Sequence, residues 1–152
     1  MSEQINLREA SDSDGEEIAI LFRLTRNENL PYLPDLHSPD EDLEYFAEII
    51  KDQTVIVSQI GDNVVGFCAY NDNWLNHLYI TPEYQHHGIG KSLLDQAKAH
   101  NSELNLWVFQ KNTAARDFYE KNGFELLELR DGQANEEHEP DAHYIWSKAD
   151  KN

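Results

Sequence analysis

A turn with two glycines, Gln85-His86-His87-Gly88-Ile89-Gly90, joins an apolar strand-like run (74–80) to a helix-like run that starts at Lys91. Where a loop opens directly into a helix, the first backbone N–H groups have no intrahelical acceptor, and the helix dipole adds partial positive charge. Glycine permits close approach of another group to the backbone. The segment therefore predicts an anion-binding turn suited to a phosphate or pyrophosphate.

Two familiar phosphate loops do not fit these residues. Gly90-Lys91-Ser92 reads like the end of a Walker A loop, but that motif requires glycine where this chain has Gln85. The dinucleotide fingerprint requires a third glycine three residues past Gly90, and position 93 is leucine. A Gln-x-x-Gly-x-Gly turn after a strand resembles instead the acetyl-coenzyme A (acetyl-CoA) loop of the GNAT superfamily of N-acetyltransferases. On this short pattern alone, an ordinary tight turn remains the alternative.

Composition restricts the partners of the chain. Its 152 residues suit a single domain, 1–152, with its own core. The formal net charge of −17 argues against a nucleic-acid partner, because binding to phosphate backbones relies on clustered Lys and Arg. A cationic second substrate would be attracted by the negative electrostatic field of such a chain, although the charge could equally serve solubility alone.

The sequence offers no signal for a membrane, a metal or a disulfide. Its apolar runs are too short to span a bilayer, and residues 1–6 lack the basic and apolar regions of a signal peptide, so we expect a cytoplasmic protein. The seven histidines show no spaced ligand set, so no metal is expected. Cys68, the only cysteine, is expected to be an inert, buried strand residue.

Hydrophobic periodicity and breakers predict the first half of the fold. A strand is expected over 4–9, then a helix around 18–25 that begins with a capping box from Ser13 to Glu16. Two prolines exclude regular helix from Leu30 to His37. Ser38 starts the next helix, with proline in its first turn and Glu41 three residues after the cap.

The second half alternates strands and helices. A hairpin is expected over 54–70, followed by the strand that ends at Ile80, the glycine turn and a helix to about His100. The remaining expected elements are a strand over 104–109, a helix over 112–121 that stops at Asn122-Gly123, and strands over 124–129 and 143–146 around an acidic loop, 131–141. The order β-α-α-β-β-β-α-β-α-β-β predicts an α+β or mixed α/β fold, with about four helices on a mostly antiparallel, twisted sheet.

A second motif supports the resemblance. The segment Asn112-Thr113-Ala114-Ala115-Arg116-Asp117-Phe118-Tyr119-Glu120-Lys121-Asn122-Gly123-Phe124 looks like the Asn-x-x-Ala-x-x-Phe-Tyr-Glu-x-x-Gly-Phe segment of GNAT proteins. It follows the glycine turn after one helix and one strand, as in that superfamily. The chain is identified on these two motifs as a GNAT member over roughly residues 5–147.

The resemblance implies where acetyl-CoA would bind. The main chain of Leu78, Tyr79 and Ile80 would hydrogen-bond the pantetheine arm, and Gln85 would order the turn. Asn112 matches a family position near the cofactor thiol. The amides that would hold the pyrophosphate are those of His86, His87, Gly88, Ile89, Gly90 and Lys91.

The resemblance also implies direct transfer, in which the amine attacks the thioester without a covalent enzyme intermediate. Tyr119 matches the tyrosine proposed as general acid for the departing thiolate, and a phenol with a pKa of about 10 stays protonated at neutral pH. The alternative is that Tyr119 is only a core aromatic of its helix.

The general base does not transfer from the family. Many members place a Glu or His base on the strand before the turn, on the same side as Leu78 and Ile80. In this chain strand alternation predicts that Trp74 and Asn76 occupy that side, and neither can act as a base. The same alternation directs His77 to the other face. A glutamate used by some members on the next strand is replaced by Trp107.

The acceptor side is predicted from two loops. The proline loop carries Tyr32 and His37, and the acidic loop carries Glu136 and Glu137. Tyr32, Trp74 and Trp107 are candidate walls that would suit an ammonium group through cation–π contact. The alternative for the acidic loop is a solvated surface loop.

These residues predict transfer to a small primary amine. A peptide or protein amine is one alternative, and a CoA-binding regulatory module without turnover is another. Dimers are common in this superfamily, so a homodimer is compatible with the resemblance, but no segment of the sequence specifies an interface.

Overall fold

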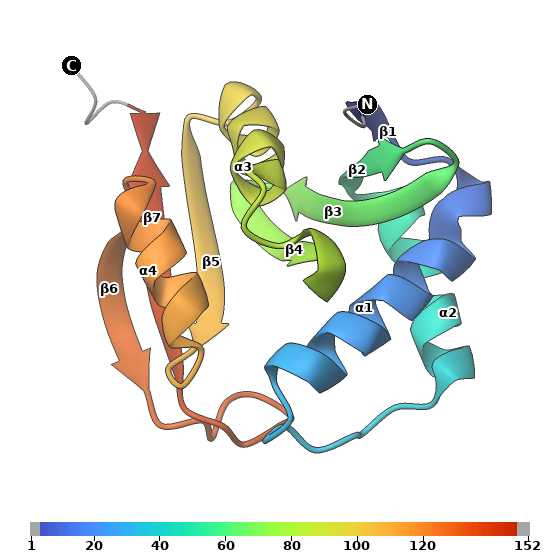
Figure 1. Ribbon diagram of the computed structural model, residues 1–152. Helices are drawn as coiled ribbons and strands as arrows, with labels where there is room; N and C mark the ends of the chain where they lie inside the picture. Colours follow the sequence, from blue (N-terminus) through green and yellow to red (C-terminus); the bar gives the residue numbers. More distant parts are fainter. Residues whose placement is uncertain (1–3, 149–152) are drawn as a thin grey trace.

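The computed structural model describes residues 4–148 and contains one seven-stranded sheet in the order β1-β2-β3-β4-β5-β7-β6 (Figure 1). Neighbouring strands are antiparallel except β4 and β5, so the predicted element order and mostly antiparallel mixed α/β fold are confirmed. The strands are β1 (Ile5–Glu9), β2 (Thr54–Ile60), β3 (Asn63–Asn71), β4 (Trp74–Ile80), β5 (Glu103–Phe109), β6 (Glu125–Arg130) and β7 (Asp141–Ser147).

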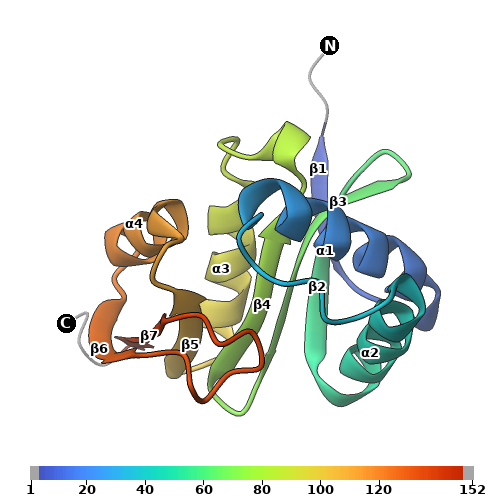
Figure 2. The same ribbon diagram turned by 90° about the horizontal axis from the view of Figure 1, so that it is seen from below.

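The helices form two layers that bury separate cores. Helices α1 (Gly15–Asn29) and α2 (Pro39–Asp52) cover one face of β2 to β4, around the buried Phe46 and Phe67. Helices α3 (Ile89–Ala99) and α4 (Thr113–Lys121) lie on the other face, where Leu93 and Tyr144 are buried (Figure 2). Two short 3-10 turns, η1 (Asp12–Asp14) and η2 (Pro82–Tyr84), complete the elements.

The sheet opens in its middle. Strands β4 and β5 share a single register pair, Trp74 with Asn105, whereas β3 and β4 share six. Beyond Trp74 the two strands separate, so the β5-facing edge of β4 lacks a ladder partner near Leu78 to Ile80. Main-chain groups at such an edge are free to pair with an extended ligand.

Helix starts agree with the sequence at one site and differ at the other. Ser38 caps α2 and forms the predicted capping box with Glu41. The predicted Ser13-to-Glu16 box is wrong: the box joins Ser11 to Asp14 around η1, and α1 begins at Gly15. The physical reason lies in the Asp14 carboxylate, which accepts from the Ser11 amide at 2.8 Å and also binds Arg8.

A bulge in β4 reverses the side-chain alternation that the sequence predicts. Tyr70 pairs with Leu75 and Ala69 with His77, so Asn76 is an extra residue in the ladder. Leu75 consequently faces the same core as Leu78. Trp74 therefore does not share the face of Leu78, and this part of the prediction is wrong.

The later elements follow the predictions within a few residues. Asn112 is the N-cap of α4, and Gly123 takes a left-handed φ of 91° after the helix, as predicted. Cys68 is fully buried in β3, as predicted, and burial raises the pKa of its thiol to about 12. No helix within residues 4–148 is both long and apolar enough to cross a bilayer.

Candidate functional site

The glycine turn has the geometry of an anion site. Gly88 is the N-cap of α3 with φ 82°, and His86 also lies in the left-handed region at φ 67°. The Gln85 side-chain amide donates to the Ile80 carbonyl at 2.9 Å and so ties the turn to the end of β4. The first-turn amides of α3 therefore stand free of intrahelical acceptors at the positive end of the helix.

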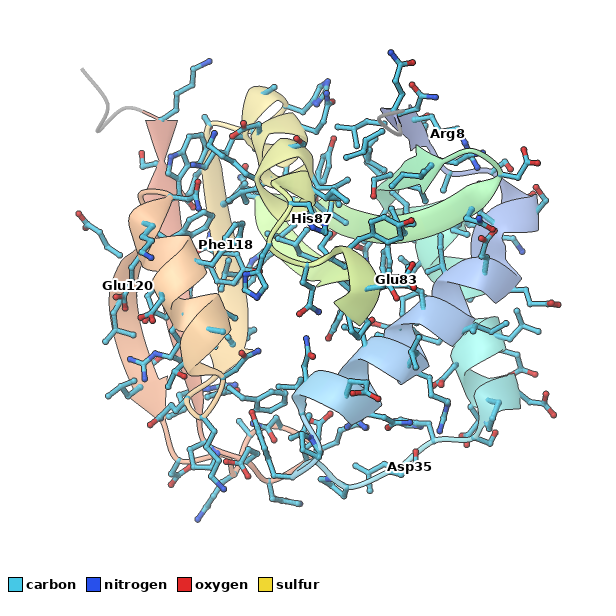
Figure 3. The ribbon with its side chains drawn as sticks, in the orientation of Figure 1. Arg8, Asp35, Glu83, His87, Phe118 and Glu120 are labelled. Atoms are coloured by element: carbon cyan, nitrogen blue, oxygen red, sulfur yellow. The ribbon has the colours of Figure 1, made fainter. Side chains whose placement is uncertain are left out.

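Space beside the turn is open. No atom lies within 4 Å of where a Cβ on Gly88 would be, and a Cβ on Gly90 would stand 3.5 Å from the Phe118 ring. Phe118 of α4 and His87 of the turn lie on the same face of the sheet (Figure 3). Lys91, the third residue of α3, pairs with Asp95 at 3.0 Å on the exposed side of the helix.

Two predicted donor-side residues come from α4. Tyr119 is buried against Phe118 and Phe124, and burial raises the pKa of its hydroxyl, so the phenol keeps its proton at neutral pH. The Asn112 side-chain oxygen accepts from the Ala115 amide at 3.2 Å. That bond caps the helix and fixes the orientation of the Asn112 side chain.

A cavity of about 260 Å³ lies on the opposite face from α3 and α4, beside the open part of the sheet. Its apolar wall contains Phe22, Leu33 and Phe109, and β4 contributes the side chains of His77 and Tyr79. Five acidic residues and two arginines also line it. The walls come from α1, α2, β4, β5 and the two loops, which we call the proline loop (30–38) and the acidic loop (131–140).

His77 lies in this cavity, contrary to its exclusion from the site on strand alternation. Its Nε2 is 2.8 Å from the Tyr45 hydroxyl, and its Nδ1 is buried without a hydrogen-bond partner in the structure. Burial among the rings of Phe22, Phe46 and Phe67 lowers the pKa of His77 to about 4. The imidazole is therefore neutral at pH 7 and can accept a proton or a hydrogen bond.

Contacts between the two loops cross one side of the cavity. His37 Nε2 is 2.7 Å from Glu136 Oε1, and Arg26 reaches Glu137 at 3.5 Å. The hydrogen bond to Glu136 raises the pKa of His37. Arg23 holds the proline loop by bonding Asp35, which lies on the connection between α1 and α2 (Figure 3).

The acidic loop is structured rather than merely solvated. Gly132 has φ 94°, and a Cβ there would lie 2.6 Å from the Glu139 backbone, so only glycine fits. Asn135 donates to the Glu139 carbonyl at 2.8 Å and accepts from its amide at 3.2 Å. These bonds hold Glu136 and Glu137 at the cavity.

The predicted acceptor residues divide into two groups. His37, Glu136 and Glu137 line the cavity, together with Tyr45, His77 and the Tyr79 side chain, which sequence reasoning did not place there. Tyr32, Trp74, Asn76 and Trp107 do not line it. The cavity is built on the face of β4 that carries His77 and Tyr79, whereas the sequence prediction used the face of Leu78 and Ile80.

The four residues outside the cavity have other contacts. Asn76 bonds Gln53 and Asn71, and the Tyr32 ring lies under the Lys111 ammonium, 5.2 Å away. Trp74 and Trp107 stack on each other, with ring centroids 5.9 Å apart, and both pack against His143. Arg130 lies 3.7 Å from the Trp107 ring centre, so the predicted cation–π partner of this tryptophan comes from the chain itself.

No cluster of three or more His, Cys, Asp or Glu side chains among residues 4–148 has the geometry to hold a metal ion. The described residues offer the free main-chain amides of the turn, the buried Tyr119 phenol and the neutral His77 imidazole.

Comparison with known proteins places the chain among N-acetyltransferases. Residues 51–126 match the model of the acetyltransferase (GNAT) domain. The chain is 26% identical over 123 residues to the peptidyl-lysine N-acetyltransferase YjaB of Salmonella typhimurium, a match that covers 80% of this chain and 84% of YjaB. Five further curated N-acetyltransferases are matched over about half of their length or less.

Solved structures share the fold. The solution structure of Escherichia coli YjaB superposes with a TM-score of 0.78 at 21% identity, over 94% of this chain and 97% of that one. The PaiA N-acetyltransferase of Thermoplasma acidophilum, solved in complex with coenzyme A, superposes with a TM-score of 0.68 at 23% identity, over 95% of this chain and 99% of that one.

Proposed function

The chain belongs to the GNAT superfamily of acetyl-CoA-dependent N-acetyltransferases, and we propose that it transfers the acetyl group to a small, cationic primary amine. The observation that carries this proposal is the cavity beside the open part of the sheet. It combines an aromatic wall, a neutral imidazole and an excess of carboxylates over arginines.

The donor side fits acetyl-CoA. The open space beside Gly88 and the free first-turn amides of α3 suit the pyrophosphate. The unpaired edge of β4 at Leu78 to Ile80 suits the pantetheine arm by added main-chain pairing. When bound there, acetyl-CoA supplies an acetyl thioester whose thiolate is the leaving group.

The acceptor side fits an ammonium group. Glu41 and Glu136 flank His37 at the cavity, while Glu137 is paired with Arg26. Charges of one sign inside a cleft raise the local concentration of ligands of the opposite sign. The cavity therefore attracts a cationic amine, and the aromatic side chains provide a less polar place for its reacting end.

Proton transfer can be assigned to two groups on opposite faces of the sheet. The amine must be neutral when it attacks, and its second proton leaves as the C–N bond forms. Tyr45, hydrogen-bonded to His77, is placed to accept that proton and pass one to the imidazole. Tyr119, kept protonated by burial, is the proposed acid that protonates the departing thiolate.

The test is release of free thiol from acetyl-CoA across a panel of small monoamines, diamines and lysine-containing peptides. Turnover on small amines, with the highest kcat/KM for those that carry a second positive charge, supports the proposal. Turnover on peptides alone would replace the small amine by a protein amine, as the name of YjaB suggests for that relative. Binding of acetyl-CoA without turnover on any amine, and without an effect of Tyr119→Phe, would favour a regulatory module.

A further inference from the structure

Helix α4 carries Tyr119, the proposed acid, but has few buried anchors of its own. It is nine residues long, and Tyr119 is the one buried residue of these nine. Isolated helices shorter than about 12 residues are marginal in water, so their position in a protein depends on tertiary contacts. The place of the Tyr119 phenol is therefore set by whatever ties α4 to the sheet.

The Tyr144 hydroxyl provides such a tie. Tyr144 is the middle residue of β7 and has no exposed surface. Its hydroxyl donates to Glu120 Oε2 at 2.5 Å and accepts from Arg116 Nε at 3.0 Å. Burial and the bond to Glu120 raise the pKa of this hydroxyl, so it stays a donor at neutral pH. One buried oxygen thus joins two side chains of α4 to the sheet.

These two side chains belong to the turn of α4 that carries Tyr119. Residues three and four apart are neighbours on a helix, so Arg116 lies beside both Tyr119 and Glu120. Glu120 is on the β6 side of the helix, and Phe118 is on the α3 side (Figure 3). The tie therefore acts on the part of the helix that determines how the phenol enters the core.

Other polar contacts of this turn are weaker. Arg116 Nη1 donates to the Gln110 carbonyl at 3.4 Å, and the Gln110 side chain donates to the carbonyls of Arg130 and Asp141 at 2.9 Å. Hydrogen bonds in which a partner is charged are roughly twice as strong as neutral ones, and both bonds of the Tyr144 hydroxyl are of that kind. Tyr144 is therefore the main polar anchor of this turn.

We propose that Tyr144 is a positioning residue for the transferase reaction: by holding α4, it keeps the Tyr119 phenol within reach of the departing thiolate. The inference rests on the proposed function, in which Tyr119 is the acid. Misplacement of a reacting group by about 1 Å can cost about 10²-fold in rate. Glu120, the glutamate of the Phe-Tyr-Glu segment, thereby has a role as the anchor of the tyrosine that precedes it.

Two variants remove the tie in different ways. Tyr144→Phe keeps the buried ring, and Glu120→Ala changes an exposed residue, so both should fold. Each should lower kcat about tenfold, with the KM for the amine and the affinity for coenzyme A within about twofold of wild type. Glu120→Gln keeps an oxygen that accepts from Tyr144 and should retain kcat. Asp117→Ala, at an exposed acidic position of the same helix, is the matched control.

A double-mutant cycle shows whether Tyr144 acts through Tyr119. Once Tyr119→Phe is present, Tyr144→Phe should not lower kcat further, because the group that it positions is gone. An equal loss in both backgrounds would indicate a general structural role and overturn this inference while the proposed function stands. Full activity of Tyr119→Phe alone would contradict the acid in the proposed function and remove this inference with it.

Hydrogen exchange tests the tie without turnover. In Tyr144→Phe and Glu120→Ala the amides of residues 117–121 should exchange faster than in wild type, because local opening of α4 becomes easier. Glu120→Gln and Asp117→Ala should keep the wild-type rates. Unchanged exchange in Tyr144→Phe would show that other contacts hold the helix and would overturn the inference.

Discussion

The proposed donor turn comes from six consecutive residues, Gln85 to Gly90, whereas the proposed acceptor cavity draws its walls from two helices, two strands and two loops. In the proposed function the turn would act through backbone amides and dihedral angles, for which two glycines and a helix start suffice. The cavity acts through side chains such as His77 and Glu136, whose neighbours depend on the tertiary structure. Local sequence therefore reports on the donor, and packing decides the acceptor.

This contrast predicts that variants will separate by substrate. Changes at the turn should raise the KM for acetyl-CoA and leave the KM for the amine unchanged, and changes in the cavity should do the reverse. Substitution of a residue that acts on the reacting groups, where acetyl-CoA meets the amine, should change kcat instead.

The largest effect is expected from Tyr119→Phe, which should lower kcat by about 10²-fold, the usual contribution of a general acid. Coenzyme A binding, measured by calorimetry, should be retained because only the hydroxyl is lost. Tyr32→Phe is the matched control: its hydroxyl is buried without a partner in the structure and does not line the cavity. Equal activity of Tyr119→Phe and wild type would remove the acid from the mechanism.

Gly88→Ala should weaken acetyl-CoA binding by about tenfold, equivalent to about 1.4 kcal/mol, because a Cβ would enter the space beside the turn. Gly61→Ala is the matched control for backbone strain. Gly61 also has a positive φ, 59°, and open space around it, but it lies in the β2–β3 hairpin. If both variants lose acetyl-CoA affinity equally, strain rather than the cradle is responsible.

Tyr45→Phe should reduce kcat/KM for the amine several-fold, since a net hydrogen bond is worth about 0.5–1.5 kcal/mol. The KM for acetyl-CoA should not change. Steady-state kinetics with each substrate varied in turn measures both. Tyr70→Phe, which removes a hydroxyl bonded to His100 away from the cavity, serves as control. A shift in the KM for acetyl-CoA alone would contradict the assignment of Tyr45 to the acceptor side.

His77 should make the stability of the fold depend on pH. Its pKa is about 4 in the folded protein and 6.5 ordinarily, so the unfolded state binds more protons between these values. The free energy of unfolding should therefore decrease as pH falls from 6.5 toward 4, and His77→Gln should flatten that dependence. Urea denaturation at a series of pH values measures it, and an unchanged slope in the variant would place the titrating group elsewhere.

The smallest effect concerns the contact between the two loops. Glu136 raises the pKa of His37, so the bridge is complete below the ordinary pKa of 6.5 and is lost as pH rises through the raised value. NMR titration should give His37 a midpoint above 6.5 that falls in Glu136→Gln. Glu137→Gln, which removes the partner of Arg26, should leave that midpoint unchanged. A midpoint insensitive to Glu136 would mean that the bridge does not form in solution.

Particular residues show how far sequence reasoning extends. Ser38 with Glu41 and Gly123 are local patterns, and the structure confirms both. The glycine turn is also local, and its Gln85 bonds the Ile80 carbonyl. Trp74 was assigned to the wrong face, because alternation assumes an unbroken ladder and β4 contains a bulge. His77 does face away from Leu78, as alternation predicts, but the cavity lies on that face. His37 and Glu136 were correctly placed near one site, although nothing in the sequence indicates that they touch.

The sequence by itself determined the order of the elements, the capped start of α2 and the glycine turn, because these depend on dihedral preferences and hydrogen bonds between residues close in the chain. Only the tertiary structure decided which side chains meet at the acceptor. The separation of β4 from β5, the bulge at Asn76 and the contact of the proline loop with the acidic loop all depend on long-range packing. A single extra residue in a strand exchanges its two faces, and no short stretch of sequence reports that exchange.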